Sequence, residues 1–250
     1  MRAFLTLTRR ELGSFFLSIT GYVIIAAAAF LLGLSFVVLL VKLRTEPLPM
    51  PVTEMFYLTP FFWIVLLLAV PVITMRLFAL EKFSGTYETL MTTPVTDMQV
   101  VLAKFAGAML FYMLMWLPLL GCLLVLRYYS ASETGMDAGS VGGTFLGIFL
   151  LGCLFISMGC FASSVTRSQM VAAMVSLAVG FSLFLVSVLA DRLPVITPWQ
   201  ADLVKHLALF DQMHDFSRGV VDTRPIIFYL SLTLLFLFLT LRSVESRRWK

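Results

Sequence analysis

The stretch from Gly21 to Val41, GYVIIAAAAFLLGLSFVVLLV, decides the fold because it runs for 21 residues without a charged side chain. Roughly 20 apolar residues in an α-helix are long enough to cross the hydrocarbon core of a bilayer. The apolar region of a secretory signal peptide is shorter, about 7–15 residues. We therefore interpret this stretch as a membrane span that is retained in the protein.

Similar apolar runs recur along the rest of the chain. They extend over Met55 to Met75, Phe105 to Leu126, Val141 to Val165, Met170 to Ala190 and Pro225 to Leu241. Each run is continuous, whereas the strands of a membrane barrel alternate between apolar and polar residues, so the runs indicate helices. The sequence predicts an all-α, polytopic membrane protein with six transmembrane helices, forming one domain over residues 1–250.

The overall composition supports this class and excludes several others. Hydrophobic residues make up 60% of the chain and charged residues 13%, against about 45–50% and about 25% in soluble domains. The net charge is +4, but the basic residues are scattered, so no nucleic-acid partner is expected. Cys122, Cys153 and Cys160 lie in apolar runs without the spacing of a disulfide framework or a metal site.

The distribution of Lys and Arg predicts the orientation. Cytoplasmic loops of membrane proteins are enriched in these residues. If both termini are cytoplasmic, the inner segments hold eleven of the 18 Lys and Arg, the short outer loops hold three, and the segment 191–224 holds four. We therefore expect both termini on the cytoplasmic side.

Residues 1–20 precede the first span and are amphipathic. On a helical projection, Phe4, Leu12 and Phe15 share one arc, while Arg2 and Arg9 share the opposite arc. This pattern predicts an interfacial helix on the inner leaflet. The alternative is a frayed N-terminal extension of the first span.

The outer connection 191–224 is too long to be a simple turn. It contains Pro194 and Pro198, then a stretch from Ala201 to Val220 that favours a short helix, with Trp199 as an anchor at the membrane interface. The segment Ser130 to Gly143 is rich in Gly and Ser and is interpreted as a loop.

Several kinds of chemistry are missing from the sequence. The six runs contain no Asp, Glu, Lys, Arg or His, whereas gradient-driven transporters usually place such ionisable groups inside the membrane. There is no Walker loop, no H-E-x-x-H and no G-x-S-x-G motif. His206 and His214 are about 12 Å apart along a helix, too far to bind one metal, and are assigned to a surface helix. We expect no catalytic residue, no cofactor and no metal site.

The inner connection 76–104 has a defined pattern. Its first part, with Met75 and Val95 as flanking residues, reads MRLFALEKFSGTYETLMTTPV. We predict a break at Gly85, then a short helix that ends before Pro94, because proline disfavours a helical conformation in the preceding residue. Such a short helix could dock a cytoplasmic partner. The alternative is a solvated loop whose charges only keep it inside.

This connection resembles the loop after the second span in the permease family of type-2 ABC exporters. The matching residues are Glu81, Lys82, Gly85, Thr86, Glu88, Leu90, Pro94 and Val95. The chain differs at Leu80, where many members carry a second acidic residue. The resemblance implies a permease subunit that is not itself an enzyme and that couples ATP hydrolysis by a separate cytoplasmic ATPase to export.

The same resemblance implies roles for the loop. Segment 76–104 would contain the coupling helix, with Glu81, Lys82 and Glu88 making polar contacts to the ATPase, Gly85 as a hinge and Leu90 as an apolar contact. Thr86 and Pro94 complete the pattern. The resemblance further implies a homodimer or a paired permease, contact with membrane lipid, and residence in the inner membrane of a bacterial cell.

The C-terminal part resembles the gliding-motility-associated branch of the family, and the nitrous-oxide-reductase maturation branch stays open as an alternative. This resemblance implies that the outer segment acts as a gate or docks a partner with a periplasmic domain, and that the complex either exports a solute or transmits force. The residues assigned to this outer role are Trp199, Phe210, Phe216, Arg218 and Gly219.

Two other function classes are kept as alternatives. One is a gradient-driven secondary transporter or channel, which would respond to uncouplers in vesicles without ATP. The other is a membrane enzyme or assembly scaffold. The spans are uniformly apolar, so the sequence predicts neither a pore-lining face nor a cargo.

Overall fold

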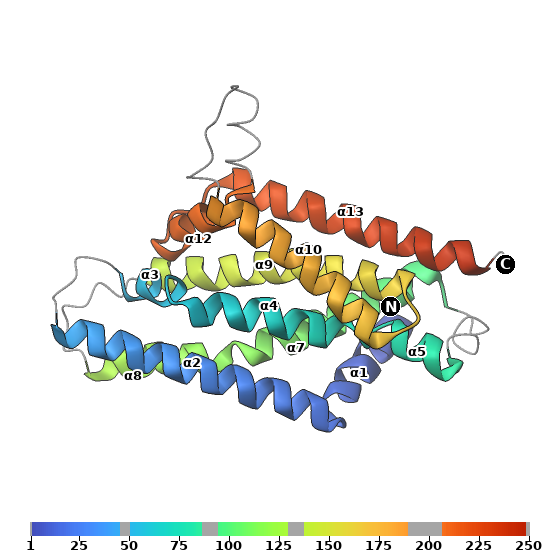
Figure 1. The fold of residues 1–250 in the computed structure, drawn as a ribbon, viewed down its shortest axis with the longest axis horizontal. Helices are drawn as coiled ribbons and strands as arrows, with labels where there is room; N and C mark the ends of the chain where they lie inside the picture. The colour runs from blue at the N-terminus through green and yellow to red at the C-terminus, as the bar shows by residue number, and fades with distance from the viewer. Residues whose placement is uncertain (1, 46–50, 87–94, 130–137, 190–206, 249–250) are drawn as a thin grey trace.

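The computed structural model describes residues 2–45, 51–86, 95–129, 138–189 and 207–248, which form helices joined by turns (Figure 1). The helices, in chain order, are α1 (Arg2–Phe16), α2 (Ile19–Thr45), α3 (Val52–Tyr57), α4 (Pro60–Thr74), α5 (Ala79–Ser84), α7 (Asp97–Met115), α8 (Leu117–Tyr129), α9 (Ala138–Val165), α10 (Gln169–Leu189), α12 (Leu209–Ser217) and α13 (Thr223–Arg248).

Six helical segments are long and apolar enough to cross a membrane, which confirms the predicted all-α fold with six spans. Because the number of spans is even, the two ends of the chain lie on the same side. Figure 1 shows α1, α5 and the end of α13 together at one end of the bundle, and α3 toward the other. We call the end with the termini the inner end, following the predicted topology, and the opposite end the outer end.

The second and third apolar runs are each divided between two helices, which the hydropathy pattern did not reveal. The second run begins in α3, and α4 starts only at Pro60. The third run contains the break between α7 and α8 at Trp116. α7 itself begins at Asp97, where Thr96 and Gln99 form a capping box that satisfies free backbone N–H groups.

α9 begins at Ala138, so the prediction of a loop through Gly143 is wrong for the described residues 138–143, of which 141–143 follow the predicted span Val141 to Val165 instead; residues 130–137 lie outside the described part. The small residues in this segment serve packing instead. A Cβ on Gly143 would overlap the backbone carbonyl of Phe216, and a Cβ on Gly147 would overlap Met213. The glycines let α12 approach α9 closely.

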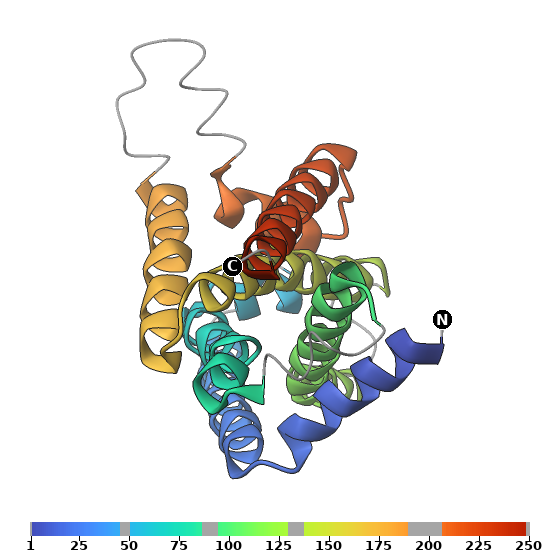
Figure 2. The ribbon, with the colours of Figure 1, turned by 90° about the vertical axis from the view of Figure 1, so that its right-hand side faces the viewer.

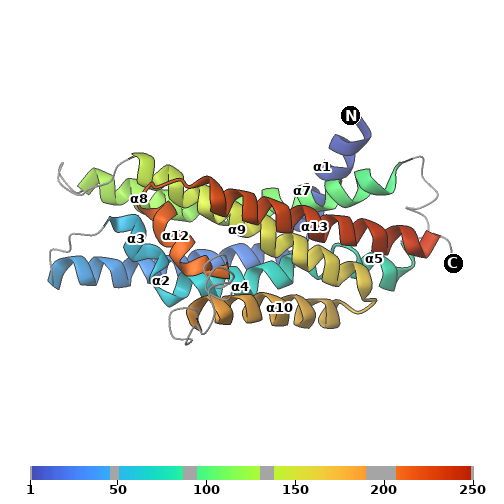
Figure 3. The same cartoon turned by 90° about the horizontal axis from the view of Figure 1, so that it is seen from above.

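α9 forms the centre of the bundle. It is mostly buried and contacts α4, α7, α10, α12 and α13, whereas α10 and α13 lie at the periphery and expose most of their surface (Figures 2 and 3). Near the inner end, Gly159 lies against the side chain of Thr74 on α4, leaving no room for a Cβ. α9 therefore connects the two ends of the molecule as one packed helix.

The N-terminal helix α1 packs along α7 rather than only lying on a membrane surface. Thr8, Glu11 and Phe15 face α7 and are buried, and Phe15 stacks on Phe111 with ring centroids 4.6 Å apart. Leu5, which lies on the same arc as Phe4 and Phe15 in the helical projection, is 65% exposed. The helix ends at Phe16, so residues 17–20 do not belong to it.

Candidate functional site

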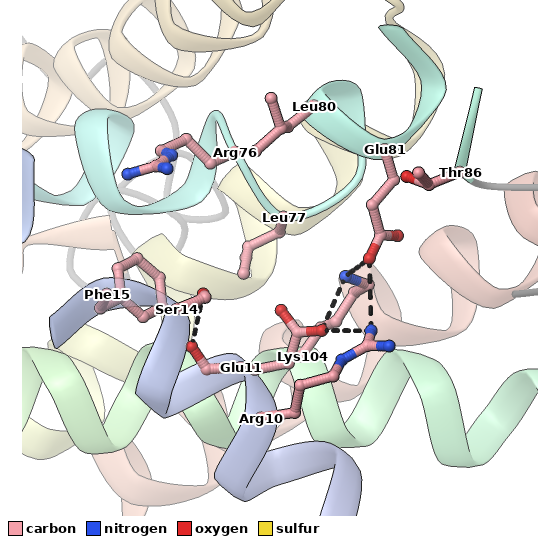
Figure 4. Close-up of a pocket in the computed structure, with 10 residues that line it drawn as sticks. All are labelled: Arg10, Glu11, Ser14, Phe15, Arg76, Leu77, Leu80, Glu81, Thr86 and Lys104. Carbon is pink, nitrogen blue, oxygen red and sulfur yellow. Dashed lines mark hydrogen bonds and ion pairs between the residues drawn. The ribbon is translucent and has the colours of Figure 1, made fainter. Parts of the chain in front are cut away.

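Four charged side chains from three helices meet at the inner end of the bundle (Figure 4). Lys104 on α7 is 2% exposed, and its Nζ lies 3.1 Å from Oε1 of Glu11 on α1 and 2.8 Å from Oε1 of Glu81 on α5. Arg10 on α1 lies 2.9 Å from the same oxygen of Glu11 and 3.5 Å from that of Glu81. We call these four residues the inner charge cluster.

The composition of this cluster explains how Lys104 can be buried. A buried ammonium group requires a compensating charge, and Lys104 has two carboxylates within hydrogen-bonding distance. The ring of Phe78 adds a cation–π contact, with Nζ 5.4 Å from its centroid. Arg10 balances the second carboxylate, so the cluster is neutral overall and links α1, α5 and α7.

The turn between α4 and α5 is fixed to the end of α9 by hydrogen bonds. The backbone N–H groups of Phe78 and Ala79 both donate to Oγ of Ser163, each at 3.1 Å. The ammonium group of Lys82 donates to the backbone carbonyl of Ser164. α5 is thus held on one side by the inner charge cluster and on the other by α9.

The structure brings together only some of the residues assigned to the coupling loop. The contacts of Glu81 described above lie within the chain, as does the bond from Lys82 to α9. Gly85 ends α5 with a φ of 74°, a left-handed conformation that favours glycine, which agrees with the predicted break. Thr86 is exposed. Glu88, Leu90 and Pro94 lie outside the described residues.

Sequence reasoning did not single out Phe83, which is 79% exposed at the end of α5. The sequence pattern that could have indicated Phe83 is an aromatic residue next to the charged residues Glu81 and Lys82, which is unusual in a loop that only contacts solvent. It also did not pair Lys104 with Glu11, which precedes it by 93 residues.

An open cavity of about 630 Å³ borders the inner charge cluster. It lies between α1, the turn after α4 and α7 (Figure 4). Its lining combines the four residues of the cluster with Ser14, Phe15, Arg76, Leu77, Leu80 and Thr86.

A second group of charges joins α3 to α12 toward the outer end. Glu54 on α3 is 1% exposed, and its carboxylate accepts two hydrogen bonds from Arg218, at 2.9 and 3.0 Å. Nε2 of His214 lies 2.9 Å from Oε1 of Glu54. We call Glu54, His214 and Arg218 the outer charge cluster.

The outer charge cluster changes the acid–base behaviour of its carboxyl group. Burial alone would raise the pKa of Glu54, but the hydrogen bonds and positive charge of Arg218, together with His214, outweigh it and lower the pKa. The Glu54 carboxylate in turn raises the pKa of Arg218. Glu54 is therefore ionised at neutral pH although its side chain is buried.

α12 also has uncharged contacts with its surroundings. The hydroxyl group of Thr53 donates to the carbonyl of Ser217 at 2.7 Å, and the N–H of Phe210 donates to Oγ of Ser187 on α10 at 2.9 Å. The ring of Phe210 stacks on that of Trp63, with centroids 5.5 Å apart. These contacts therefore hold α12 against α3, α4 and α10.

These contacts correct two predictions for the outer segment. The helix expected from Ala201 to Val220 is shorter in the described part, where α12 covers Leu209–Ser217, because Gly219 takes a left-handed conformation with a φ of 80°. His214 does not simply lie on a surface helix, since it contacts Glu54. The structure groups Phe210, Phe216 and Arg218 with Gly219 around α12, while Trp199 lies outside the described residues.

The described residues contain no group of three or more His, Cys, Asp or Glu side chains that could hold a metal ion. The two charge clusters can transmit movement between helices, because each joins helices that are far apart in the sequence. The inner one joins α1, α5 and α7, and the outer one joins α3 and α12.

Comparison with known proteins agrees with this arrangement. No curated protein matches the chain. Residues 25–239 match the family described as ABC-2 family transporter protein, a stretch that covers most of the chain and all but the edges of the six spans. This confirms the resemblance to type-2 ABC permeases at the level of the family. The chain belongs to the ABC-2 family of transporter proteins and is a multi-pass membrane permease subunit of an ABC transporter.

Proposed function

We propose that this permease works with a separate cytoplasmic ATPase and that the ATPase transmits force to the membrane spans through segment 76–104. Family membership supports the ATP-driven class. The observation that carries the proposal is the burial of Lys104 between Glu81 of α5 and Glu11 of α1. These contacts mean that α5 cannot be displaced without affecting the helices that hold its charges.

The energetics favour movement of these elements as a unit. Removing one partner from a buried ion pair costs about 3–5 kcal/mol, because the other charge is left without compensation. A displacement of α5 that keeps Glu81 in contact with Lys104 avoids this cost. The bonds from Phe78 and Ala79 to Ser163 extend the unit to α9, the helix that reaches the outer end.

Within this proposal, the loop residues have two different roles. Glu81 and Lys82 position the loop through contacts inside the chain. Phe83, with 79% of its surface exposed, and Thr86 form the adjoining surface for the ATPase. Gly85 sets the direction of the chain between the two groups. Glu88, Leu90 and Pro94 lie outside the described residues, and their proposed role as further contacts of the ATPase rests on the family resemblance.

We propose that both termini and segment 76–104 are cytoplasmic, as the distribution of Lys and Arg predicts, and that the protein resides in the inner membrane of a bacterial cell. α2 and α10 expose long apolar faces, which include Phe30 and Met174 at 65% and 68%. We propose that these faces contact lipid and a second permease in a homodimer.

We further propose that α12 is the movable part of an outer gate, or of a docking surface for a periplasmic partner, which the outer charge cluster holds closed. Because Glu54 is buried and ionised, separating it from Arg218 requires water or another cation to replace that partner. This outer element is what a gliding-motility-associated complex would use to export a solute or to transmit force.

The alternative, a gradient-driven transporter, requires an ionisable group within the spans. In the described part of the chain, the buried residues Glu11 and Glu54 lie outside the six candidate spans, and Lys104 lies in the inner part of the third span, paired with Glu11 and Glu81. This placement favours ATP-driven coupling. A gradient-driven carrier would instead lose activity when an uncoupler is added to vesicles without ATP.

Co-purification tests the proposal directly. The tagged permease is purified in detergent from its native cells, and any ABC ATPase retained with it is identified by mass spectrometry and measured for wild type, Glu88→Arg and Gly85→Pro. Glu245→Arg, at an exposed position on α13, is the matched charge-reversal control. We expect wild type and the control to retain the ATPase and the two loop variants to lose it. Failure of wild type to retain any ATPase would refute the proposal.

A further inference from the structure

Arg76 has an unusual position at the inner end. It lies in the turn after α4, its NH1 donates to Oγ of Ser18 at 2.8 Å, and it lines the cavity beside the inner charge cluster. Within the described residues, no carboxylate lies within ion-pair distance of its guanidinium group. The carboxylates of Glu11 and Glu81, which balance the charge of Lys104, therefore do not form ion pairs with Arg76.

The neighbours of Ser18 indicate the depth of Arg76 in the membrane. Leu17 and Ile19, on either side of Ser18, are 91% and 83% exposed. Two large apolar side chains exposed at a helix junction of a membrane protein belong in the hydrocarbon region. Arg76 is hydrogen-bonded to the residue between them. This favours a position of its guanidinium group near the boundary between hydrocarbon and lipid headgroups, where lipid phosphates can act as counter-ions.

The cavity has an excess of positive charge that suits a phosphate. Its lining contains three cations, Arg10, Arg76 and Lys104, and two carboxylates, Glu11 and Glu81, which leaves one positive charge in excess. Lys104 and Arg10 both contact the two carboxylates, so the excess charge is that of Arg76. Guanidinium groups bind phosphate oxygens in a fork geometry.

We propose that this cavity binds the phosphate group of an anionic phospholipid, such as phosphatidylglycerol, with Arg76 as its main contact. The acyl chains lie beside the exposed Leu17 and Ile19. The lipid fills the space between α1 and the turn after α4, so it stabilises the inner end of the permease. This site does not depend on the coupling role proposed for the loop.

Native mass spectrometry of the purified permease tests the wild-type protein. Detergent samples receive phosphatidylglycerol, phosphatidylcholine with the same acyl chains, or soluble glycerol phosphate. We expect phosphatidylglycerol to be retained at least fivefold more than phosphatidylcholine, with no retention of glycerol phosphate. Equal retention of the two lipids would overturn the proposal. Binding of glycerol phosphate as strong as that of the lipid would overturn the assignment to a lipid.

Variants locate the site on the protein. We expect Arg76→Gln to reduce phosphatidylglycerol retention at least fivefold and Arg76→Lys to restore part of it, because the ammonium group keeps the charge but loses the fork geometry. Arg242→Gln removes one exposed cation from the last turns of α13, outside the cavity, and is expected to match wild type. Retention by Arg76→Gln equal to that of wild type would place the lipid elsewhere and overturn the proposal.

Discussion

Replacing Lys104 with methionine tests the inner charge cluster most sharply, because methionine keeps the length and the apolar part of the side chain. The change leaves the carboxylates of Glu11 and Glu81 without the ammonium group between them. Losing one partner of a buried ion pair costs about 3–5 kcal/mol. Arg10 still contacts both carboxylates but is 54% exposed, so we expect the lower end of that range, about 3 kcal/mol.

Thermal unfolding in detergent measures this loss. For a chain of this size, 1 kcal/mol corresponds to a Tm change of about 2–4 °C, so Lys104→Met should lower the Tm by about 6–12 °C. Arg242→Gln is the control, because Arg242 pairs with Glu245 at an exposed position. Exposed pairs are worth about 0–1 kcal/mol, so its Tm should fall by less than about 4 °C.

A double variant separates charge from packing. If repulsion between uncompensated carboxylates causes the loss, adding Glu81→Gln to Lys104→Met should recover part of the stability, since one carboxylate is then neutral. A Tm of Lys104→Met no lower than that of the Arg242→Gln control would refute the structural role of the cluster. Fully additive losses in the double variant would refute the electrostatic explanation.

Three further predictions concern other parts of the bundle. Gly159→Ala should lower the free energy of unfolding by about 1–3 kcal/mol because the added Cβ overlaps the neighbouring side chain of α4. Gly33→Ala, whose Cβ meets open space, should leave the stability nearly unchanged, and thermal unfolding compares the two variants. Ser163→Ala should cost about 1–3 kcal/mol by removing the acceptor of two backbone amides, which should then exchange hydrogen faster. The ionised form of Glu54 stabilises the fold above its ordinary pKa of 4.5, and this contribution is lost as the pH falls through the lowered pKa. The Tm difference between wild type and Arg218→Gln should therefore shrink between about pH 7 and acid pH. A Tm difference that stays constant would contradict the pairing of Glu54 with Arg218.

The six spans were predictable because apolar length alone requires a helix in lipid, and the break at Gly85 was predictable because glycine readily adopts a left-handed conformation. The break at Trp116 was not found, since hydropathy averages over the residues around it. A loop through Gly143 was predicted because Gly and Ser are typical of loops. In the folded protein that glycine lies within a helix and makes room for the backbone of α12.

The two charge clusters could not be predicted from the sequence. Glu54 pairs with a residue 164 positions away, and Lys104 pairs with Glu11 at a separation of 93 positions. Glu54 and Lys104 each lie just outside an apolar run, so hydropathy treats them as parts of loops. Only the packing of α1 on α7, and of α12 on α3, brings the opposite charges together and buries them.

We propose that ATP hydrolysis by the partner ATPase at the inner end opens the outer element, and labelling of Thr53→Cys tests this coupling most directly. Thr53 is 1% exposed and donates a hydrogen bond to the carbonyl of Ser217 on α12. In nanodiscs that hold the permease with the ATPase, both faces are accessible, and a membrane-impermeant maleimide should label this cysteine several-fold faster when ADP and vanadate are trapped in the ATPase after hydrolysis. The parent chain without this cysteine gives the background. The increase should disappear in Lys104→Met that still retains the ATPase. Equal labelling with and without nucleotide, or an unchanged increase in Lys104→Met, would contradict the claim.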